Sequence, residues 1–553
     1  MKRTLPLRLC AFARVIPVFV FILIISVWPT FAVRVERLID TWRPEHYTVN
    51  LTFNDTLSEI NSASARIDVV VLKQTSVIDL DFGELTTTGV TLNSKPLSFE
   101  HKAGKLKINL PSAATPKTRL TLVIEYHGKP KDGLVLTNDK DGKPSAVGDN
   151  WPDRVHHWIP ALDHASAKAT VTFNVTVPAG LEVVANGRLD HVETVATGQR
   201  TWTYSEGVPI PPYCMIVAVG QFARVEPSEK ALTPLSYYVP QSEKDLAVQG
   251  FTPTIPTLEF FTHTVAPYPY EKLTMIVGAT RFGGMENSSA IVFTSSLLSR
   301  ASREGLSKTY GIPSGNVTLI AHEIAHQWFG DSVTESTWAD LWLSEGFATY
   351  FAGLFVQRYE GEDVFQAYMK NAATTAFAYE KKKRTPIVDR DTEKLFDLLN
   401  ANNYQKGAWV LHMLRSRLGD EAFFRGIRAY YEAHKSSVAT TEDLRAALEK
   451  ASGKDLKPFF TRWVYDSGHP QYELTWQWVS EKNVRLVLKQ LQPGNAFLDP
   501  VPVMITTAGG SREVVLKPSG PELIEMIPLR EKPIGIEIDP RGTLLKEATV
   551  RGI

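Results

Sequence analysis

The sequence predicts a multidomain protein with an all-β N-terminal domain, a mainly α-helical middle domain and a small C-terminal β-sandwich. Three observations support this fold class. The chain has 553 residues of which 43% are apolar, enough to bury more than one sizeable core. Apolar and polar residues alternate in the N-terminal and C-terminal parts of the chain, and apolar residues recur at helical spacing in its middle. We place the domains at residues 33–240, 241–468 and 469–553, behind an N-terminal segment 1–32.

The N-terminal domain is predicted from short alternating runs separated by turn residues, which are typical of half-buried strands. Examples are Thr48–Phe53, Ala65–Leu72, Leu106–Leu110, Leu120–Tyr126 and Ala169–Val177. The stretch 129–153 is rich in Gly, Pro, Asp and Lys. We expect it to form a long surface loop or a crossing between sheets that could rim a cleft.

The middle domain is predicted from segments in which apolar residues recur at helical spacing. These are Ile255–Val265, Val317–Trp328, Leu341–Tyr359, Asp363–Tyr379, Gln405–Leu418, Glu421–His434 and Thr441–Ala451. Alternation then returns in Tyr472–Val479, Val484–Leu491, Val501–Thr507, Glu513–Leu516 and Ile534–Ile538. A small β-sandwich is therefore expected to follow the helices.

The first 32 residues have the layout of a signal peptide. Four basic residues precede the uncharged apolar run Val15–Trp28, and the small residue Ala32 follows it. The run is shorter than the roughly 20 residues that a membrane span needs. We expect cleavage near Ala32 and export to the periplasm or the medium. The alternative is an uncleaved anchor, the one route by which we expect this chain to contact a membrane.

Charge and cysteine content narrow the possible partners and cross-links. Basic and acidic residues both total 60, so no charge excess indicates binding to nucleic acid or to an anionic membrane. The two cysteines are Cys10 and Cys214. Because Cys10 would leave with the signal peptide, no intramolecular disulfide is expected in the mature protein. Glycosylation sequons begin at five asparagines and matter only in a eukaryotic secretory pathway: Asn50, Asn54, Asn174, Asn287 and Asn316.

The predicted helix Val317–Trp328 carries a metal-binding pattern at His322, Glu323 and His326. Histidines four positions apart share one helix face, so both can reach one ion while Glu323 lies beside it. A catalytic zinc usually takes a third protein ligand, and Glu345 on the next predicted helix is the best candidate. We expect one Zn²⁺ per chain on His322, His326 and Glu345, with Glu323 as general base. The alternative is a helix whose histidines only pack or face solvent.

Two aspartates flank the turn between these helices. Ligating histidines usually donate their second ring nitrogen to a carboxylate or a carbonyl, so Asp331 or Asp340 could orient one of them. Each could equally be an ordinary capping or turn residue.

Upstream of the metal pattern stands Arg281-Phe282-Gly283-Gly284-Met285-Glu286-Asn287. This segment resembles the Gly-Ala-Met-Glu-Asn motif of the gluzincin family that contains aminopeptidase N and leukotriene hydrolase. Gly284 stands where that family usually has alanine. The resemblance implies a thermolysin-like zinc peptidase domain in which Glu286 binds the free α-amine of the substrate. Gly283, Gly284, Met285 and Asn287 are expected to contact the substrate beside it.

The resemblance extends to Pro267–Leu273 and to Tyr404–Gly407, which occur in the family's order. Tyr404 stands where the family keeps the tyrosine that stabilises the tetrahedral intermediate. The family's N-terminal domain usually offers a glutamine near the amine, which this chain lacks; Asn150 or Trp151 could fill its place. Many relatives also carry a large helical domain after the sandwich, so we expect a more open cleft here.

The resemblance therefore implies a zinc aminopeptidase that removes N-terminal residues from peptides with a free N-terminus. Other functions stay open from the sequence. The same zinc site could serve an endopeptidase or an epoxide hydrolase, and the same scaffold could be a catalytically silent peptide-binding module.

Overall fold

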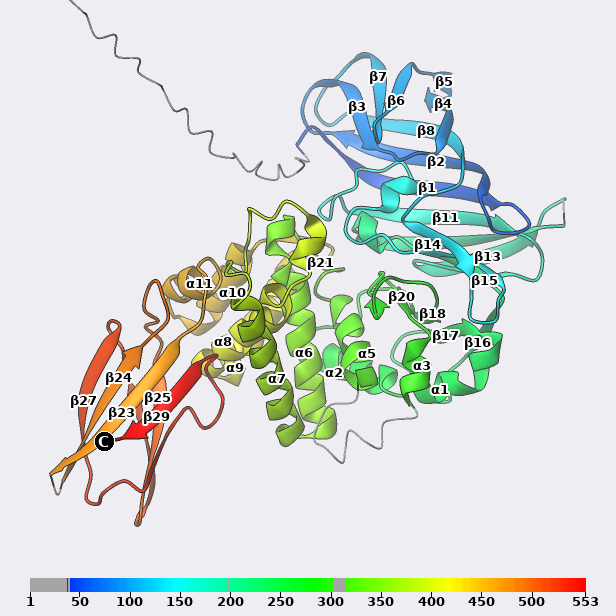
Figure 1. Ribbon diagram of the computed structural model, residues 1–553. Helices are drawn as coiled ribbons and strands as arrows, with labels where there is room; N and C mark the ends of the chain where they lie inside the picture. The colour runs from blue at the N-terminus through cyan, green and yellow to red at the C-terminus, as the bar shows by residue number, and fades with distance from the viewer. Residues whose placement is uncertain (1–36, 38–39, 197, 302–314, 481) are drawn as a thin grey trace, which may run out of the picture.

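The computed structural model describes residue 37 and residues 40–196, 198–301, 315–480 and 482–553. The predicted signal segment 1–32 lies outside these residues. Among the helices of the described ranges, none is both long and apolar enough to cross a membrane. The helical part lies between a large β domain and a small β domain (Figure 1). This arrangement confirms the predicted fold class.

The N-terminal domain is built on an eight-stranded sheet of order β13-β14-β11-β1-β2-β8-β4-β5, with two smaller sheets, β3-β7-β6 and β12-β15-β10-β9. Alternate residues of its strands point into one core, as the predicted period of two requires. The strands are β1 (Trp42–Phe53), β2 (Ile60–Val71), β3 (Thr75–Asp81), β4 (Thr86–Leu92), β5 (Lys95–Pro96), β6 (Phe99–Lys102), β7 (Lys105–Ala114), β8 (Arg119–Gly128), β9 (Leu134–Asn138), β10 (Pro144–Gly148), β11 (Ala169–Val177), β12 (Glu182–Ala185), β13 (Arg188–Thr194), β14 (Arg200–Ile210) and β15 (Val217–Gly220).

The stretch 129–153 is not the continuous loop that its composition suggested. It contains β9 and β10, which pair as a hairpin, and β10 also pairs with β15. Residues 139–143, with the sequence Asp-Lys-Asp-Gly-Lys, form the hairpin turn between β9 and β10, as their turn chemistry favours. The end of the stretch brings Trp151 to a cavity in the helical part, so the expected rim of a cleft is present.

The middle part contains a five-stranded sheet as well as helices. Its order is β16-β17-β18-β20-β19, in which β18 pairs in parallel with β17 and β20, and β19 is the antiparallel edge strand. The strands β16 and β17 lie before the boundary that we predicted at residue 240, and their pairing ties them to this sheet. The bounds are β16 (Phe222–Val225), β17 (Leu235–Pro240), β18 (Leu273–Val277), β19 (Gly284–Met285) and β20 (Ala290–Phe293).

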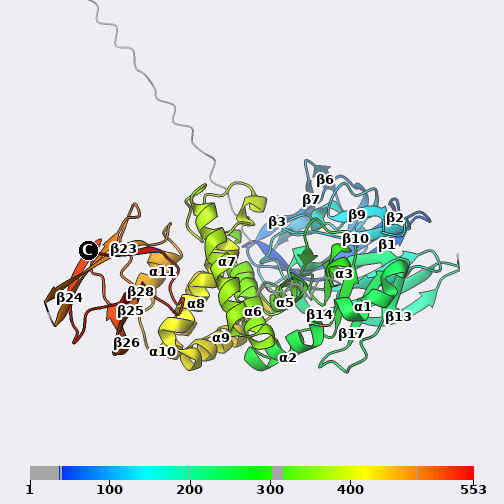
Figure 2. The same ribbon diagram turned by 60° about the horizontal axis from the view of Figure 1, so that its bottom comes forward.

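The helices of the middle part form the centre of the molecule (Figure 2). Helix α5 packs against α6, and every residue of α6 from Trp342 to Val356 is buried, as expected of a helix that is apolar on all sides. Each predicted helix is present. The bounds are α1 (Ala247–Gly250), α2 (Thr254–Thr264), α3 (Ser296–Ala301), α5 (Gly315–His326), α6 (Trp342–Glu360), α7 (Glu362–Glu380), α8 (Gly407–Leu418), α9 (Asp420–His434), α10 (Thr441–Ser452) and α11 (Lys457–Trp463), with short strands β21 (Val333–Glu335) and β22 (Ser437–Ala439).

The C-terminal domain is a sandwich of a four-stranded sheet, β27-β24-β23-β29, and a three-stranded sheet, β26-β25-β28. Its buried residues belong to the same apolar cluster as the helices, so the two parts share a core. The sequence did not predict β27 and β29. The bounds are β23 (Gln471–Ser480), β24 (Asn483–Gln490), β25 (Val501–Thr507), β26 (Gly510–Leu516), β27 (Glu522–Pro528), β28 (Gly535–Ile538) and β29 (Glu547–Gly552).

A buried ionic cluster joins the helices to this sandwich. Glu380 at the end of α7 accepts from Lys406 Nζ at 2.5 Å and is bonded to His469 Nδ1. Lys406 also donates to the carbonyl of Gly468 at 2.9 Å. Burial disfavours the charged carboxylate, but hydrogen bonding to His469 and the charge of Lys406 outweigh it and lower the pKa of Glu380 to about 2.

We expect this carboxylate to make folding acid-sensitive. Because the pKa of Glu380 is lower in the folded chain than its ordinary 4.5, its contribution is complete above pH 4.5 and is lost as the pH falls towards 2. The shift corresponds to about 3 kcal/mol at neutral pH. Urea unfolding should therefore show Glu380→Gln destabilised at pH 7, with the difference from the unchanged protein shrinking below pH 4.5.

The matched control is Glu421→Gln, because Glu421 forms an exposed ion pair with Arg425 and such pairs contribute little. A difference between Glu380→Gln and the unchanged protein that stays constant from pH 7 to pH 3 would contradict this account.

Candidate active site

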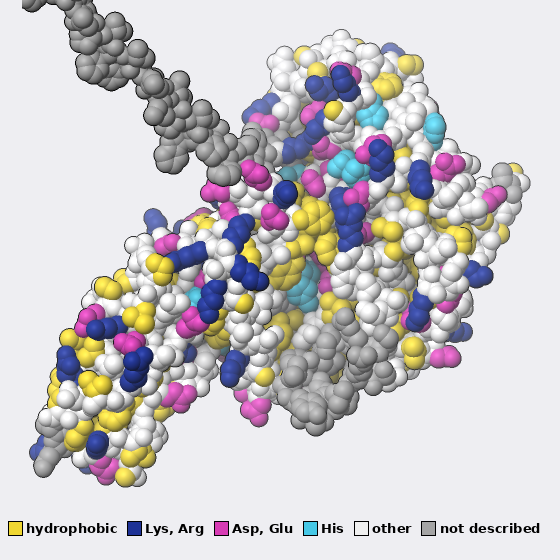
Figure 3. Space-filling view, in the orientation of Figure 1, with side chains coloured by type: hydrophobic (Ala, Val, Ile, Leu, Met, Phe, Trp, Pro, Cys, Tyr) yellow, Lys and Arg dark blue, Asp and Glu magenta, His cyan; other side chains and the backbone are white. Residues whose placement is uncertain are grey.

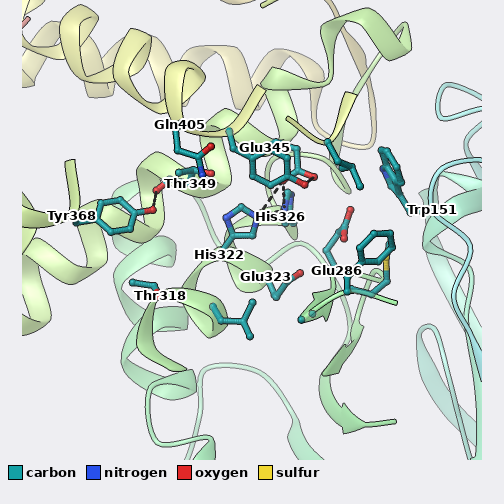
Figure 4. A pocket seen from close by; sticks show the side chains of 17 residues that line it. Trp151, Glu286, Thr318, His322, Glu323, His326, Glu345, Thr349, Tyr368 and Gln405 are labelled. Carbon is teal, nitrogen blue, oxygen red and sulfur yellow. Dashed lines mark hydrogen bonds and ion pairs between the residues drawn. The ribbon is translucent and has the colours of Figure 1, made fainter. Parts of the chain in front are cut away.

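A cavity of about 350 Å³ opens between the edge strand β19 and the helices α5 and α6. The space-filling view shows a hollow between the N-terminal part and the helices, where histidine and hydrophobic side chains are visible (Figure 3). All three predicted zinc ligands line the cavity, together with Glu286, Glu323 and Tyr404 (Figure 4). The fold thus brings together residues that stand more than a hundred positions apart in the chain.

The predicted metal ligands form one compact cluster. One ligand atom from each of His322, His326 and Glu345 lies within 4.8 Å of the others. The two Nε2 atoms are 3.1 Å apart, and His322 Nε2 is 3.2 Å from Glu345 Oε2. Two imidazoles and one carboxylate suit zinc and leave a fourth position for water or substrate. The donor set therefore fits the ion that the sequence predicts.

The orientation of His326 also fits a metal ligand. Its Nδ1 lies 3.1 Å from the carbonyl oxygen of Phe329 and 3.0 Å from Ser344 Oγ. Because a carbonyl can only accept, Nδ1 carries the proton, and Nε2 presents its lone pair to the cluster. Such a partner fixes the tautomer of a ligating histidine.

The two flanking aspartates do not fill this orienting role. Asp331 accepts from Gln327 Nε2 at 2.9 Å and from Cys214 Sγ at 3.2 Å. Asp340 accepts from the hydroxyl and the amide of Thr441. A backbone carbonyl and a serine orient His326 instead, and neither carries a recognisable sequence signal.

Three carboxylates converge on the cluster, and their environments differ. Burial disfavours the charged form of Glu345, but His326 and His322 outweigh it and hold the pKa of this carboxyl well below its usual range. Burial raises the pKa of Glu323 and of Glu286. Glu286, Glu323 and His326 also have ligand atoms within 4.8 Å of one another. The charged forms of Glu286 and Glu323 therefore need a nearby cation.

The edge strand β19 brings its backbone close to the cluster. A Cβ atom built on Gly284 would lie 2.5 Å from the carboxylate of Glu323, so the missing side chain gives that carboxylate its space. Gly283, Gly284 and Met285 line the cavity, as expected. Asn287 does not belong to the lining. Its fully buried side chain donates to the Met285 carbonyl at 3.4 Å, and its contact with the substrate stays a prediction.

Tyr404 reaches the cluster from a single π-helical turn, Asn402–Lys406, that leads into α8. Such turns often occur at functional sites. The hydroxyl donates to Glu345 Oε1 at 2.6 Å. Burial raises the pKa of Tyr404 well above its ordinary value, so the phenol keeps its proton and remains a donor.

Of the two candidates for the missing glutamine, Trp151 lies at the cavity. The amide of Asn150 is occupied in the core, where it donates to the Met215 carbonyl and accepts from Trp158 Nε1 at 2.8 Å. The Trp151 ring lies edge-on to Phe282, with centroids 6.1 Å apart. Trp151 therefore adds an aromatic wall to the cavity, and it stays the candidate for the place of the missing glutamine.

Apart from Gln405, which follows Tyr404 in the motif 404–407, the remaining lining residues had no motif to reveal them. They come from α5, α6, α7 and the segment before α8: Thr318, Leu319, Thr349, Tyr368, Leu399 and Gln405. Single residues at irregular spacing produce a cavity wall only after the helices pack.

Comparison with known proteins supports this reading of the site. Residues 43–214 match the Peptidase M1 N-terminal domain, and residues 251–463 match the Peptidase family M1 domain. Together these matches include every residue of the cluster, Glu286 and Tyr404.

Similar proteins include Tricorn protease-interacting factor F2 of Thermoplasma acidophilum, which is 26% identical over 81% of this chain and 57% of its own length. Aminopeptidase M1-A of Oryza sativa subsp. japonica is 28% identical over 78% of this chain and 50% of its own. Glutamyl aminopeptidase of Homo sapiens is 27% identical over 78% and 47%. The chain spans about half the length of the relatives it matches. On these matches, and on the motifs that now share one cavity, the chain belongs to peptidase family M1, the gluzincin family that its motifs resemble.

Proposed function

We propose that this protein is a zinc-dependent aminopeptidase that removes N-terminal residues from peptides. The observation that carries the proposal is the position of Glu286. Its carboxylate is buried at the cavity and lies within 4.8 Å of ligand atoms of Glu323 and His326. A carboxylate fixed so close to the cluster favours a cationic terminus and admits one residue between that terminus and the scissile bond.

His322, His326 and Glu345 would hold the zinc ion. Bound zinc supplies Lewis acidity that polarises a carbonyl and activates water near neutral pH. Relatives named aminopeptidase M1-A and glutamyl aminopeptidase support peptide hydrolysis at such a site.

Glu323 would act as general base and then as general acid. Its buried carboxylate lies beside the cluster, where it can take a proton from the attacking water. It would then hand this proton to the leaving amine, so that both transfers use one carboxylate.

Tyr404 would bind the negative charge that develops on the scissile carbonyl, and Glu286 would bind the positive charge of the substrate's N-terminus. The Tyr404 hydroxyl keeps its proton and donates to Glu345 at 2.6 Å; with substrate present it would donate to the developing oxyanion. Glu286 would pair with the α-ammonium, and that cation would favour its charged form. The open edge of β19 would align the peptide backbone beside them.

Other functions remain as outcomes of the tests. An endopeptidase would use the same cluster on blocked peptides, which the buried Glu286 disfavours. A lipid epoxide hydrolase would need a long apolar channel, and a silent binding module would not need the cluster. Export of the chain rests on residues 1–32 and stays a prediction.

The first test compares aminoacyl-anilides with their N-acetyl counterparts, with and without a zinc chelator. We expect cleavage of the free-amine substrates alone, because Glu286 has no cation to bind in an acetylated one, and we expect the chelator to abolish it. Liberated aniline gives the rate. Equal cleavage of both series would favour the endopeptidase, and no cleavage of a zinc-loaded protein would favour the binding module.

Replacing the general base should separate metal binding from turnover. We expect Glu323→Gln to keep stoichiometric zinc, since Glu323 is outside the proposed ligand set, and to lose at least about a hundredfold in kcat. Elemental analysis and anilide hydrolysis measure the two quantities. His326→Ala is the matched variant that should lose both. Retained turnover in Glu323→Gln would remove this residue from the mechanism.

Removing the phenolic hydroxyl should slow the chemical step. We expect Tyr404→Phe to lower kcat by roughly a hundredfold, as is typical for the loss of one oxyanion donor, with little change in KM. Tyr368→Phe is the control, because this tyrosine also lines the cavity but its hydroxyl donates to the Thr349 carbonyl. If both variants behave alike, Tyr404 has no special part in turnover.

A further inference from the structure

The residue that follows the second histidine of the cluster makes a saturated set of hydrogen bonds. Gln327 comes directly after His326, and its side chain is fully buried. Its Oε1 accepts from the Ser289 amide at 2.8 Å and from the Tyr268 hydroxyl at 3.0 Å. Its Nε2 donates at 2.9 Å to the carbonyl of Glu286 and at 2.9 Å to Asp331 Oδ2.

Among ordinary side chains, an amide suits this place because it both donates and accepts. The Ser289 amide can only donate and the Glu286 carbonyl can only accept, so these two backbone groups fix which end of the Gln327 amide is oxygen. A carboxylate offers no donor here and an ammonium offers no acceptor. One side chain therefore holds both ends of the four-residue segment 286–289.

We propose that Gln327 is a positioning residue for amine recognition, which holds Glu286 at a set distance from His322, His326 and Glu345. The inference rests on the proposed function, because it assigns Glu286 to the substrate's ammonium. The same short segment supplies His326 to the cluster and a hydrogen bond to the backbone of Glu286. A shift of about 1 Å between two such groups can cost a hundredfold in rate.

The segment 286–289 has other supports, which we expect to keep it folded when Gln327 is changed. Asn186 Nδ2 donates to the Ser288 carbonyl at 2.6 Å, and Ser289 Oγ accepts from the Gly187 amide at 2.7 Å. These contacts come from the N-terminal domain. Gln327, by contrast, ties the carbonyl of Glu286 itself to the end of α5, so it sets the distance to the cluster.

Gln327→Glu is the informative variant. It keeps the shape and both accepted bonds but loses the two donated ones. By its charge alone, the added carboxylate would strengthen the binding of a nearby ammonium. A loss of amine binding would therefore indicate that Glu286 has changed position. Tyr268→Phe is a milder variant, because it leaves the other three bonds of Gln327. The hydroxyl that it removes shares its one proton between Gln327 Oε1 and the Lys272 carbonyl, both at 3.0 Å.

Gln490→Glu is the matched control. Gln490 at the end of β24 also makes four bonds: it accepts from the Phe497 amide and Gln492, and it donates to the carbonyls of Phe497 and Gly520. Its replacement removes the same kinds of bond in the C-terminal sandwich.

The test is calorimetric titration of the zinc-loaded protein with L-leucine and with N-acetyl-L-leucine. Both ligands end in a free carboxylate, so neither carries the peptide bond after the first residue that an aminopeptidase cleaves. The preference is the ratio of the two dissociation constants. We expect the unchanged protein to prefer leucine and Gln327→Glu to lose at least about tenfold of that preference while retaining its zinc. Tyr268→Phe should lose less, and Gln490→Glu should lose none. In a Glu286→Gln background, Gln327→Glu should have no further effect, because it acts through Glu286.

The outcomes separate the inference from the function on which it rests. If the unchanged protein prefers leucine over N-acetyl-leucine and Gln327→Glu keeps the same preference, only the positioning role of Gln327 is overturned. Equal binding of both ligands by the unchanged protein would instead overturn amine recognition at Glu286. If Gln327→Glu loses zinc or does not fold, Tyr268→Phe decides, and an unaltered preference there overturns the positioning role.

Discussion

The structure depends on burying several ionisable groups together at the junction of α5 and α6. Burying a carboxylate is costly unless a cation or hydrogen bonds compensate it, and Glu286, Glu323 and Glu345 all lie in one cavity. The apolar packing of α6, which is buried from Trp342 to Val356, holds these groups in place against their mutual repulsion. The buried carboxylates therefore make the binding of cations at this site favourable. A divalent metal and a substrate ammonium would be such cations.

The flanking domains hold in place the segments that carry the charged groups of the cavity. Lys168 at the start of the β11 region donates at 2.7 Å to the carbonyls of both Asp331 and Ser332, just after the cluster helix. From the opposite side, Lys406 in the π turn of Tyr404 donates to Glu380, which is also bonded to His469 at the start of the C-terminal domain. Lys406 is fully buried and Lys168 is half-buried, so breaking the contact of Lys406 would leave an uncompensated buried charge. The N-terminal and C-terminal domains thus act as supports of the cavity.

Most of the fold and the centre of the site could be predicted because their signals are periodic or fixed in spacing. The turn of a helix places His322 and His326 on one face, and strand alternation predicts the two β domains. The hairpin within 129–153 was missed because its strands do not alternate, and β10 is buried at four consecutive positions. Strand β27 was missed because its apolar residues point to both faces, with Ile524 and Met526 exposed and Ile527 buried. The orientation of His326 by a backbone carbonyl, and the four bonds of Gln327, arise only when distant segments pack, so no local pattern contains them.

The departure at Trp151 makes the placement of Glu286 more important in this chain. An amide beside the ammonium would share its recognition, but Asn150 is bonded within the core and Trp151 offers an aromatic wall. Under the proposed function, recognition of the amine by hydrogen bonding and charge would fall mainly on one carboxylate, whose interaction with a cation weakens with distance and with hydration. A single contact of this kind discriminates well only if its position is fixed. The four hydrogen bonds of Gln327 behind Glu286 would meet this requirement if Glu286 binds the amine as we propose.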